Sequence, residues 1–515
     1  MKKLIVFFFI LFTVSLFAQE GFYLLTTMGG DSVGDQFSVV SHIGDVNADG
    51  FDDVIVGAPG GDYAKLFFGG DVFDTIPDLI FRDYKQLNCQ FGCSIAGDGD
   101  INGDGYTDII IGASSTWTGP SFPYQIMTTG AAYVYFGGPT IDTTADLTLI
   151  VGDWLASTGW YYGFGKAVCI PGDLNGDGYD DFVIGAANDD YDAHGRAYIY
   201  FGVPNVDDKW DVLLEGEEVF DNFGFSLSKV GDMNKDGYDD VLIGAPMFHN
   251  NIPGKIYQGG KAYLVYGDSE ISLNNSIEFI GDTSSYQYGR FISGLGDVNG
   301  DANNDLGIMG GEYLNIISGN DFSNINSFYS AGDMWYISSL NNLNHDGFND
   351  FAYVTDSLRI FWGQPLLDTI PNYVFNWAEQ VSYLGFINND STPEIAFTVS
   401  GGWDPIGKIY VYSFGDLNSV DDEKDVKLNN YELFQNYPNP FNSSTIIKYS
   451  IPKQEQVMLK IYDQLGRIIT ILVNNIQNAG EYQIEFNTES LSSGVYFYQL
   501  IAGNVFLTNK LILLK

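Results

Sequence analysis

Short apolar runs bounded by glycine and polar residues recur along most of the chain. Residues 182–186 read Phe-Val-Ile-Gly-Ala, and residues 111–113 and 243–245 repeat the Ile-Gly-Ala ending. A second kind of run is aromatic and ends in Phe-Gly, as at 133–137 and 198–202. Runs of this length that are rich in β-branched and aromatic residues are typical of strands. Long helical periods are few, so the pattern predicts an all-β chain with many turns.

A nine-residue polar loop precedes the Ile-Gly-Ala run in each repeat. In the cleanest copy, at 173–181, side-chain oxygens occupy positions 1, 3, 5 and 9, and Gly178 occupies position 6. A glycine at that position permits the positive φ that a tight loop needs. Hard cations bind six to eight oxygens at roughly 2.3–2.6 Å, which the Asp and Asn side chains and the carbonyl of position 7 can supply. The pattern therefore predicts a calcium loop.

Six copies of this loop and a seventh trace recur with a mean period of about 57 residues, and we expect about four to six calcium ions. Copy five has Ala302 at the glycine position, which costs on the order of 1 kcal/mol if the left-handed backbone is kept. Copy six begins with Asn342 and loses one carboxylate, and a seventh trace at 386–394 has lost its first ligand and its glycine, so we expect no metal there. The candidate metal ligands are Asp45, Asn47, Asp49, Asp53, Asp100, Asn102, Asp104, Asp108, Asp173, Asn175, Asp177, Asp181, Asp232, Asn234, Asp236, Asp240, Asp297, Asn299, Asp301, Asp305, Asn342, Asn344, Asp346 and Asp350.

Two other structures, an EF-hand and a hairpin turn without metal, use similar residues. An EF-hand requires a bidentate Glu at position 12 and flanking helices, but position 12 here is Ile184, inside a predicted strand. A hairpin turn that binds no metal would use the same residue types, but the recurrence of the loop argues against it. We expect calcium to stabilise the fold by offsetting the repulsion of clustered carboxylates. A direct bridge from calcium to a ligand is the alternative role.

Each repeat predicts about four short strands joined by turns. A Phe-Gly pair precedes the loop, as at 91–92, 164–165 and 223–224, and the aromatic run follows it. A four-stranded unit has an apolar face that it cannot bury alone, so neighbouring units must stack. Radial stacking of such units makes a β-propeller.

The order Phe-Gly, Gly-Asp-x-Asn-x-Asp-Gly, Ile-Gly-Ala and Tyr-x-Phe-Gly resembles the FG-GAP repeat of integrin α-subunit propellers, over about residues 21–415. The resemblance implies seven repeats closed into one seven-bladed β-propeller, with calcium bound by the loops on one rim. It also implies that an N-terminal strand, here residues 22–25, completes the final blade. We therefore predict an FG-GAP β-propeller over residues 19–415.

The N-terminus has the pattern of a secretory signal peptide. Lys2 and Lys3 precede an apolar run over 4–17, and a cleavage site follows Ala18, which assigns residues 1–18 to the signal. A membrane anchor is the alternative, but the run is shorter than the roughly 20 residues that a spanning helix needs. No later stretch could span a membrane, so we predict export through the periplasm.

Composition narrows the classes of partner. The chain has 23 Lys and Arg against 66 Asp and Glu, for a net charge of −43. Nucleic acids and anionic lipid surfaces require basic patches, so neither is expected as a partner.

Cys89 and Cys93 are close enough in sequence to form a disulfide, if the fold gives them the required geometry. Cys169 lies in an apolar strand pattern and is expected to be a buried small residue.

The chain changes character after residue 415. Residues 416–430 are predicted to be an acidic linker, and residues 427–515 carry seven basic and six acidic side chains. The acidic excess therefore belongs to the repeats and the linker, which together carry 14 basic and 60 acidic side chains once the signal peptide is removed. Alternating strands predicted at 445–451, 457–462, 482–486, 495–500 and 506–513 form a small Ig-like β-sandwich.

The motifs of this last module resemble the C-terminal sorting domain of the type IX secretion system. They are Asn-Tyr-Pro-Asn-Pro-Phe-Asn at 436–442, Ile-Tyr-Asp-x-Leu-Gly-Arg at 461–467 and Leu-Ser-Ser-Gly-Val-Tyr at 491–496. The resemblance implies that residues 431–515 are recognised by the type IX secretion machinery, which delivers the protein to the outer cell surface or the medium. An adhesive sandwich domain is the alternative.

No catalytic motif stands out. The four His form no metalloprotease pair, and neither a Gly-x-Ser-x-Gly elbow nor a P-loop occurs. We therefore predict an exported calcium-binding propeller, not an enzyme, that mediates adhesion to an unknown extracellular protein or glycan. One alternative is a secreted polysaccharide-active enzyme or its accessory binding module. A structural envelope protein is another.

Overall fold

A computed structural model of the chain divides it into two compact units, residues 1–415 and 416–515. The structure describes residues 22–83, 89–114, 130–150, 163–187, 194–252, 255–281, 286–330, 334–376, 378–390, 392–399, 407–415, 432–433, 436, 441–442, 444–451, 453, 455–462, 467–477, 480–487, 491, 493–502 and 505–513. The predicted signal peptide (1–18) and linker (416–430) lie outside these residues. Each unit is described by itself.

The first unit is built from four-stranded antiparallel sheets, and its described part contains seven of them. The first two are β2 (Val39–His42), β3 (Val54–Ala58), β4 (Tyr63–Phe67), β5 (Leu79–Phe81) and β6 (Phe91–Ala96), β7 (Ile109–Ala113), β8 (Ala131–Tyr135), β9 (Leu147–Leu149). The third is β10 (Phe164–Gly172), β11 (Asp181–Ala186), β12 (Arg196–Tyr200), β13 (Val212–Glu215). The fourth is β14 (Ser226–Gly231), β15 (Asp240–Ala245), β18 (Lys261–Val265), β19 (Ile277–Ile280).

The remaining sheets complete the unit. The fifth is β20 (Phe291–Gly296), β21 (Asp305–Gly310), β22 (Tyr313–Ile317), β23 (Asn324–Tyr329), and the sixth is β24 (Tyr336–Asn341), β25 (Asp350–Val354), β26 (Ser357–Phe361), β27 (Tyr373–Asn376). The seventh contains β28 (Gln380–Gly385), β29 (Glu394–Val399), β30 (Lys408–Phe414) and β1 (Phe22–Gly29). A hairpin, β16 (His249–Ile252) and β17 (Lys255–Gln258), and a 3₁₀ turn, η1 (Leu273–Asn275), complete the described elements.

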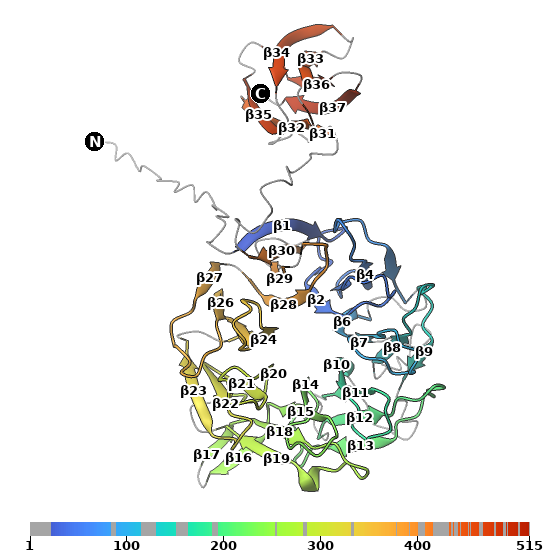
Figure 1. Ribbon diagram of the computed structural model, residues 1–515, viewed down its shortest axis with the longest axis vertical. Helices are drawn as coiled ribbons and strands as arrows, with labels where there is room; N and C mark the ends of the chain where they lie inside the picture. The colour runs from blue at the N-terminus through green and yellow to red at the C-terminus, as the bar shows by residue number, and fades with distance from the viewer. Residues whose placement is uncertain are drawn as a thin grey trace, which may run out of the picture. The chain divides into compact units, whose positions relative to one another are not determined.

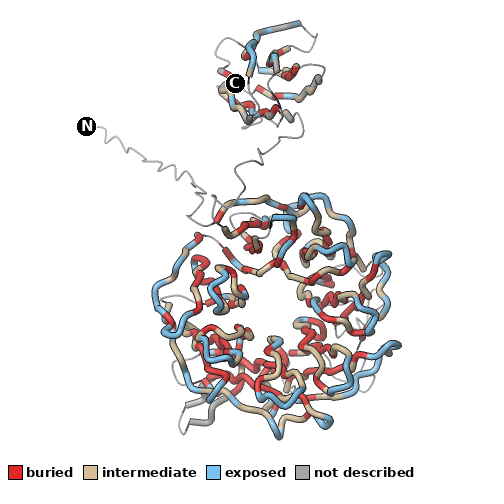
Figure 2. Tube along the Cα trace, viewed as in Figure 1, coloured by how far each residue is buried: buried red, intermediate tan, exposed pale blue. Residues whose placement is uncertain are grey.

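The first strands of the sheets surround a common axis (Figure 1). Neighbouring first strands contact one another in the order β2, β6, β10, β14, β20, β24 and β28, and β28 contacts β2 again. The second strands are almost entirely buried, whereas the fourth strands are more exposed, as Figure 2 shows by colour. This arrangement of repeated four-stranded sheets is consistent with a β-propeller.

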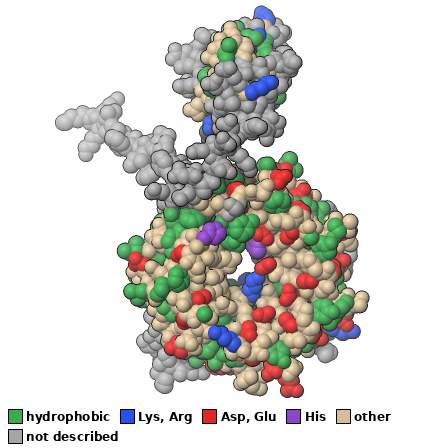
Figure 3. Space-filling model, viewed as in Figure 1, with side chains coloured by type: hydrophobic (Ala, Val, Ile, Leu, Met, Phe, Trp, Pro, Cys, Tyr) green, Lys and Arg blue, Asp and Glu red, His purple; other side chains and the backbone are tan. Residues whose placement is uncertain are grey.

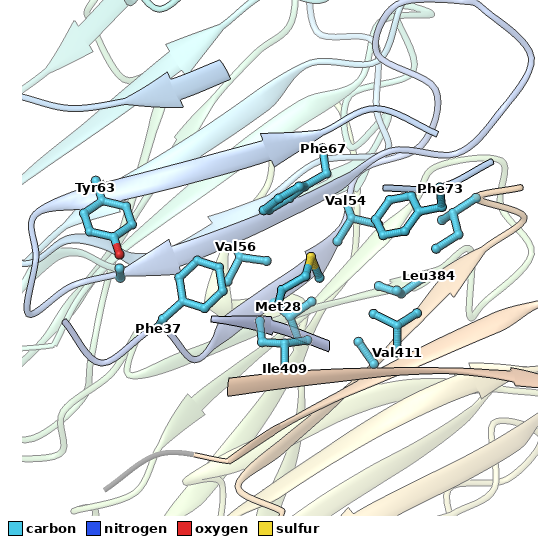
Figure 4. Close-up of a cluster of buried hydrophobic side chains, with 14 residues drawn as sticks. Met28, Phe37, Val54, Val56, Tyr63, Phe67, Phe73, Leu384, Ile409 and Val411 are labelled. Carbon is cyan, nitrogen blue, oxygen red and sulfur yellow. The ribbon is translucent and has the colours of Figure 1, made fainter. Parts of the chain in front are cut away.

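The two ends of the first unit meet in its last sheet. Strand β1 pairs antiparallel with β30, in a register that places Phe22 opposite Phe414 and Gly29 opposite Lys408. The prediction that an N-terminal strand at 22–25 completes the final sheet is therefore confirmed. A hydrophobic cluster joins this sheet to the first one, and Figure 4 shows its side chains from both, among them Met28, Val56 and Val411.

Glycines let adjacent sheets approach at backbone distance. A Cβ on Gly112 would lie 2.0 Å from the carbonyl oxygen of Gly165, and one on Gly185 would lie 2.1 Å from that of Gly224. Gly165 and Gly224 belong to the Phe-Gly pairs and have φ values of +79° and +83°, which favour glycine. The Ile-Gly-Ala glycine of one sheet therefore packs on the Phe-Gly glycine of the next, which explains why both motifs recur.

The second unit contains a three-stranded sheet, β31 (Glu432–Leu433), β32 (Ser444–Ile451) and β35 (Gly480–Asn487). Its other sheet has the order β34 (Ile468–Gln477), β33 (Glu455–Tyr462), β36 (Gly494–Ala502), β37 (Val505–Leu513). One core cluster takes side chains from both sheets, including Ile447 and Leu500, so the sheets pack face to face. The sequence patterns did not predict β34.

The described residues contain no α-helix, as predicted. None of their elements is a helix long and apolar enough to cross a membrane. All three cysteines are free, so the pair considered for Cys89 and Cys93 is not formed. Cys169 is buried, as predicted.

Gly185→Ala is expected to destabilise the first unit by about 1–3 kcal/mol, because the added Cβ overlaps the Gly224 carbonyl and forces two sheets apart. Gly70→Ala is the matched control, since a Cβ there meets no atom within 4 Å. Chemical denaturation of the mature chain measures both. Equal stability of the two variants would show that the sheets can separate without cost.

Candidate calcium loops

The predicted calcium loops connect the first and second strands of six sheets. In loop three, between β10 and β11, the backbone is left-handed at position 4 (Gly176, φ +78°) and at position 6 (Gly178, φ +93°). The same two positions are left-handed in the other five loops. Two left-handed residues turn the chain tightly enough to bring alternate side chains to one side of the loop.

Backbone N–H groups hold the ligand side chains of loop three in place. Asp173 Oδ1 accepts hydrogen bonds from the N–H groups of Gly176 (2.6 Å) and Asp177 (3.1 Å), and its Oδ2 accepts from Gly178 (2.8 Å). Asn175 Oδ1 accepts from the Asp177 N–H (2.8 Å). Asp177 Oδ1 accepts from the N–H of Tyr179 at 3.1 Å. Loops one, two, four and five repeat the bonds from the N–H groups of positions 5 and 6 to the first Asp, and from the N–H of position 5 to the Asn.

The side chain at position 9 has a second connection that the sequence patterns did not indicate. Asp181 is fully buried, and its Oδ2 accepts the N–H of Leu174 at position 2 (2.8 Å). Its Oδ1 accepts the N–H of Gly202 (2.8 Å), the glycine that follows the aromatic strand. We call this side chain the clamp, because it joins the loop to the end of the third strand. The other clamps are Asp53, Asp108, Asp240, Asp305 and Asp350, all fully buried.

Burial and neighbouring charge disfavour the ionised clamps. Burial raises the pKa of Asp181 to about 7, and the carboxylates of Asp177 and Asp173 add to the rise, although the two N–H bonds oppose it. The pKa of the clamps Asp53 and Asp108 is raised to about 7 in the same way. A divalent cation among the loop carboxylates would favour the ionised clamp, because its positive charge opposes both the cost of burial and the repulsion by neighbouring carboxylates.

The donor set fits a hard cation, but the carboxylates are not preassembled as a three-acid centre. Each loop offers carboxylate and amide oxygens only, which suits calcium. Among the described residues, no group of three His, Cys, Asp or Glu side chains is arranged to hold a metal. Position 3 of each loop is an Asn, which supplies an amide oxygen and no carboxylate. The carboxylate oxygens of the clamps accept hydrogen bonds from backbone N–H groups. The assignment of the 24 loop side chains as metal ligands stays a prediction.

Loops five and six depart from the pattern as expected from their sequences. Ala302 keeps the left-handed backbone, at φ +65°, and its N–H still bonds to Asp297 Oδ2 (2.8 Å). In loop six, the buried Asn342 Oδ1 has no hydrogen-bond partner within the described part of the structure. Loop six therefore lacks the first contact that organises the other loops.

The seventh loop keeps the backbone contacts to its side chains at positions 3 and 5 and adds hydroxyl groups. Thr392 Oγ1 lies 2.6 Å from Asp390 Oδ1 and 2.6 Å from Ser413 Oγ, and Ser413 Oγ donates to the buried Glu394 Oε1 at 3.1 Å. Glu394 occupies the clamp position, with Oε2 accepting the Ile387 N–H at 3.2 Å. Burial raises its pKa to about 8. This loop satisfies its acidic side chains with protein groups.

Position 8 links consecutive loops, a second role that the sequence patterns did not indicate. Asp180 Oδ2 accepts the N–H of Asp100 in the preceding loop (2.8 Å), and Asp239 Oδ2 accepts that of Asp173 (3.1 Å). Asp52 does the same for Phe386 (2.7 Å), which joins loop one to loop seven across 334 residues. The loops therefore connect the first sheet to the last.

Comparisons with known proteins match both parts of the chain. FG-GAP repeats match residues 40–73, 164–200 and 223–265, and the secretion system C-terminal sorting domain matches residues 435–514. The chain thus carries FG-GAP repeats and a type IX sorting domain, as predicted, and the sorting domain indicates export to the cell surface or secretion.

The similar curated proteins include integrin α chains. Integrin alpha-PS2 of Drosophila melanogaster is 32% identical over 251 residues, which cover 47% of this chain and 17% of that protein. Integrin alpha-8 of Homo sapiens is 30% identical over 237 residues, 42% of this chain and 21% of that protein. The matches thus span about a fifth of those relatives. A crystal structure of BBS1N in complex with ARL6DN aligns with a TM-score of 0.49 and 9% identity, over 78% of this chain and 98% of that one.

Asp181→Ala is expected to lower the unfolding free energy by about 3 kcal/mol even in EGTA, because two buried N–H groups lose their acceptor. Asp177→Asn is the control within the same loop: its side chain is exposed, and the metal-free protein should change by no more than about 0.5 kcal/mol. Denaturant unfolding in EGTA measures both. A loss for Asp181→Ala that appears only with calcium would contradict the clamp.

A reciprocal pair of variants tests the left-handed position. Ala302→Gly should stabilise the protein by up to about 1 kcal/mol, because the left-handed backbone no longer opposes a Cβ. Gly178→Ala should destabilise it by a similar amount, since a Cβ there meets no atom and only the backbone is strained. Effects of the same sign in both thermal melts would rule out backbone strain as the cause.

Proposed function

We propose that the first unit is a seven-bladed, calcium-loaded β-propeller that binds an extracellular protein or glycan at the cell surface. The type IX machinery delivers it through residues 431–515. The ring of contacts among the first strands of seven sheets supports the blade count. The two packed sheets of residues 432–513 support an Ig-like sandwich for the sorting unit.

The loops support calcium as the bound ion. Five of them hold an Asp, an Asn and a second Asp around one turn through the same backbone N–H bonds, so a cation would meet oxygens already in place. Loops one to four have glycine at the left-handed position 6 and all three polar side chains, so we assign them the tightest sites. Calcium then acts mainly as a staple between strands, because it offsets the carboxylate repulsion that raises the clamp pKa.

The combination of an export signal with integrin-like repeats carries the adhesion proposal. The sorting domain indicates that the protein reaches the cell surface or the medium, and the repeats are similar to those of proteins named as integrins. The clamp contacts support a non-enzymatic role. The buried carboxylates that recur in the repeats are occupied by backbone N–H groups and are therefore poorly placed for acid–base chemistry.

Binding of the mature chain to glycan and matrix-protein arrays, in calcium and in EGTA, tests this function, with melting curves recorded in parallel. We expect specific binding in calcium that is lost in EGTA only as the fold weakens. The Asp177→Asn variant, which removes one carboxylate from loop three and leaves the other loops unchanged, serves as a control. Turnover of a polysaccharide without retained binding would contradict the adhesion proposal and favour the enzyme alternative.

A further inference from the structure

A channel runs through the ring of sheets of the first unit. Its volume is about 490 Å³, and side chains from all seven first strands line it. Figure 3 shows an opening at the centre of one face of this unit. The volume is within the range of about 300–1,000 Å³ that small-molecule sites occupy. Each first strand ends at its loop, so the loops surround one mouth and the strand beginnings surround the other.

Four consecutive sheets place exposed or partly exposed cations and aromatic rings around the mouth remote from the loops. Sheet registers pair Ala167 with Gly185, Ser226 with Gly244, Phe291 with Met309, and Tyr336 with Val354, so these positions are equivalent. The residue immediately before each is, in order, Lys166, Phe225, Arg290 and Trp335. We call these four side chains the cation–aromatic arc. A cation and an aromatic ring alternate along it.

The two cations of the arc lack carboxylate partners among the residues that the structure describes. Lys166 Nζ lies 4.6 Å from the centroid of the Phe225 ring, which belongs to the next sheet. Arg290 Nη1 donates to Gln287 Oε1 (2.8 Å), and its guanidinium faces the Phe291 ring. Several other basic side chains of this acidic unit pair with carboxylates, for example Lys229 with Asp98 (2.6 Å) and Arg196 with Glu215 (2.8 Å). Lys166 and Arg290 therefore place two positive charges at this mouth, where the equivalent position of the seventh sheet carries Glu379.

The channel below the arc offers hydrogen-bond acceptors. Four serines that line it donate their hydroxyl protons to backbone carbonyls, which leaves their oxygens to accept: Ser41, Ser226, Ser338 and Ser382. A ligand with several hydroxyl groups would satisfy these oxygens. The Trp335 side chain, 59% exposed, offers a flat apolar face.

We propose that the cation–aromatic arc binds a carboxylate-bearing sugar, such as the end of a uronic acid chain. Lys166 and Arg290 form ion pairs with the sugar carboxylates, and the rings of Trp335 and Phe225 pack on the sugar faces. The oxygens of the channel serines accept hydrogen bonds from the sugar hydroxyl groups. The inference rests on the proposed function and specifies its ligand class. A short acidic sugar suits the site better than a long polyanion, because the repeats and the linker together carry 60 acidic against 14 basic side chains.

Calorimetry of the mature chain with trigalacturonate, at one fixed calcium concentration, tests the proposal. The methyl ester of the same sugar is the matched ligand, because it retains the ring and hydroxyls but not the charge. We expect the acid to bind at least about tenfold more tightly than the ester, with an affinity that falls as salt rises.

Variants test the same contacts. Lys166→Glu with Arg290→Glu should weaken binding of the acid about tenfold or more, whereas Lys209→Glu, which changes an exposed cation elsewhere, should not. Trp335→Ala should weaken both ligands, with Trp210→Ala, which alters another partly exposed tryptophan, as its control. Lys166→Gln with Arg290→Gln provides a second form if the charge reversal does not fold.

Three results would overturn the proposal. They are equal binding of acid and ester, unchanged binding by the Lys166 and Arg290 variants, and binding of a glutamate tripeptide in place of the sugar. If the arrays show a ligand whose binding these variants do not affect, the proposed adhesion stands and the arc is wrong. If neither the arrays nor trigalacturonate show binding, both proposals fail.

Discussion

The buried clamp carboxylate is the contact on which the rest of each repeat depends. Taking a carboxylate out of water costs several kcal/mol, and Asp181 offsets this with two hydrogen bonds from backbone N–H groups. Those bonds fix the start of the loop to the end of the third strand. The exposed Asp and Asn side chains of the loop are then held by its own N–H groups, and a cation would relieve the charge that accumulates there.

The ring closes through contacts between neighbouring sheets. The Ile-Gly-Ala and Phe-Gly glycines bring neighbouring backbones together, and the Asp at position 8 of loops one, three and four binds a backbone N–H of the neighbouring loop. Closure at the ends uses two separate devices, strand β1 in the last sheet and Asp52 bound to the Phe386 N–H. The seventh loop lies at this closure and adds the hydroxyl groups of Thr392 and Ser413 around its acidic side chains.

Local patterns predicted most strands and the positions of the loops, because the same signals recur in successive repeats, and the resemblance to integrin α propellers predicted the closing strand. They did not predict β34 (Ile468–Gln477), whose apolar run ends in a polar stretch without clean alternation. The double role of Asp181 also escaped prediction, because its partners Leu174 and Gly202 come together only in the folded sheet. The cation–aromatic arc was not predicted either. Its four equivalent positions carry different residues, Lys, Phe, Arg and Trp, so no sequence motif marks them.

Residue-resolved hydrogen exchange of the mature chain in EGTA tests the clamp most directly. The clamp should keep the N–H groups of Leu174 and Gly202 protected without calcium, while the exposed loop amides of Asp177 and Gly178 lose protection. Exchange of Leu174 and Gly202 as fast as that of the loop amides would contradict this account. It would show that the metal, and not the buried carboxylate, holds the repeat together.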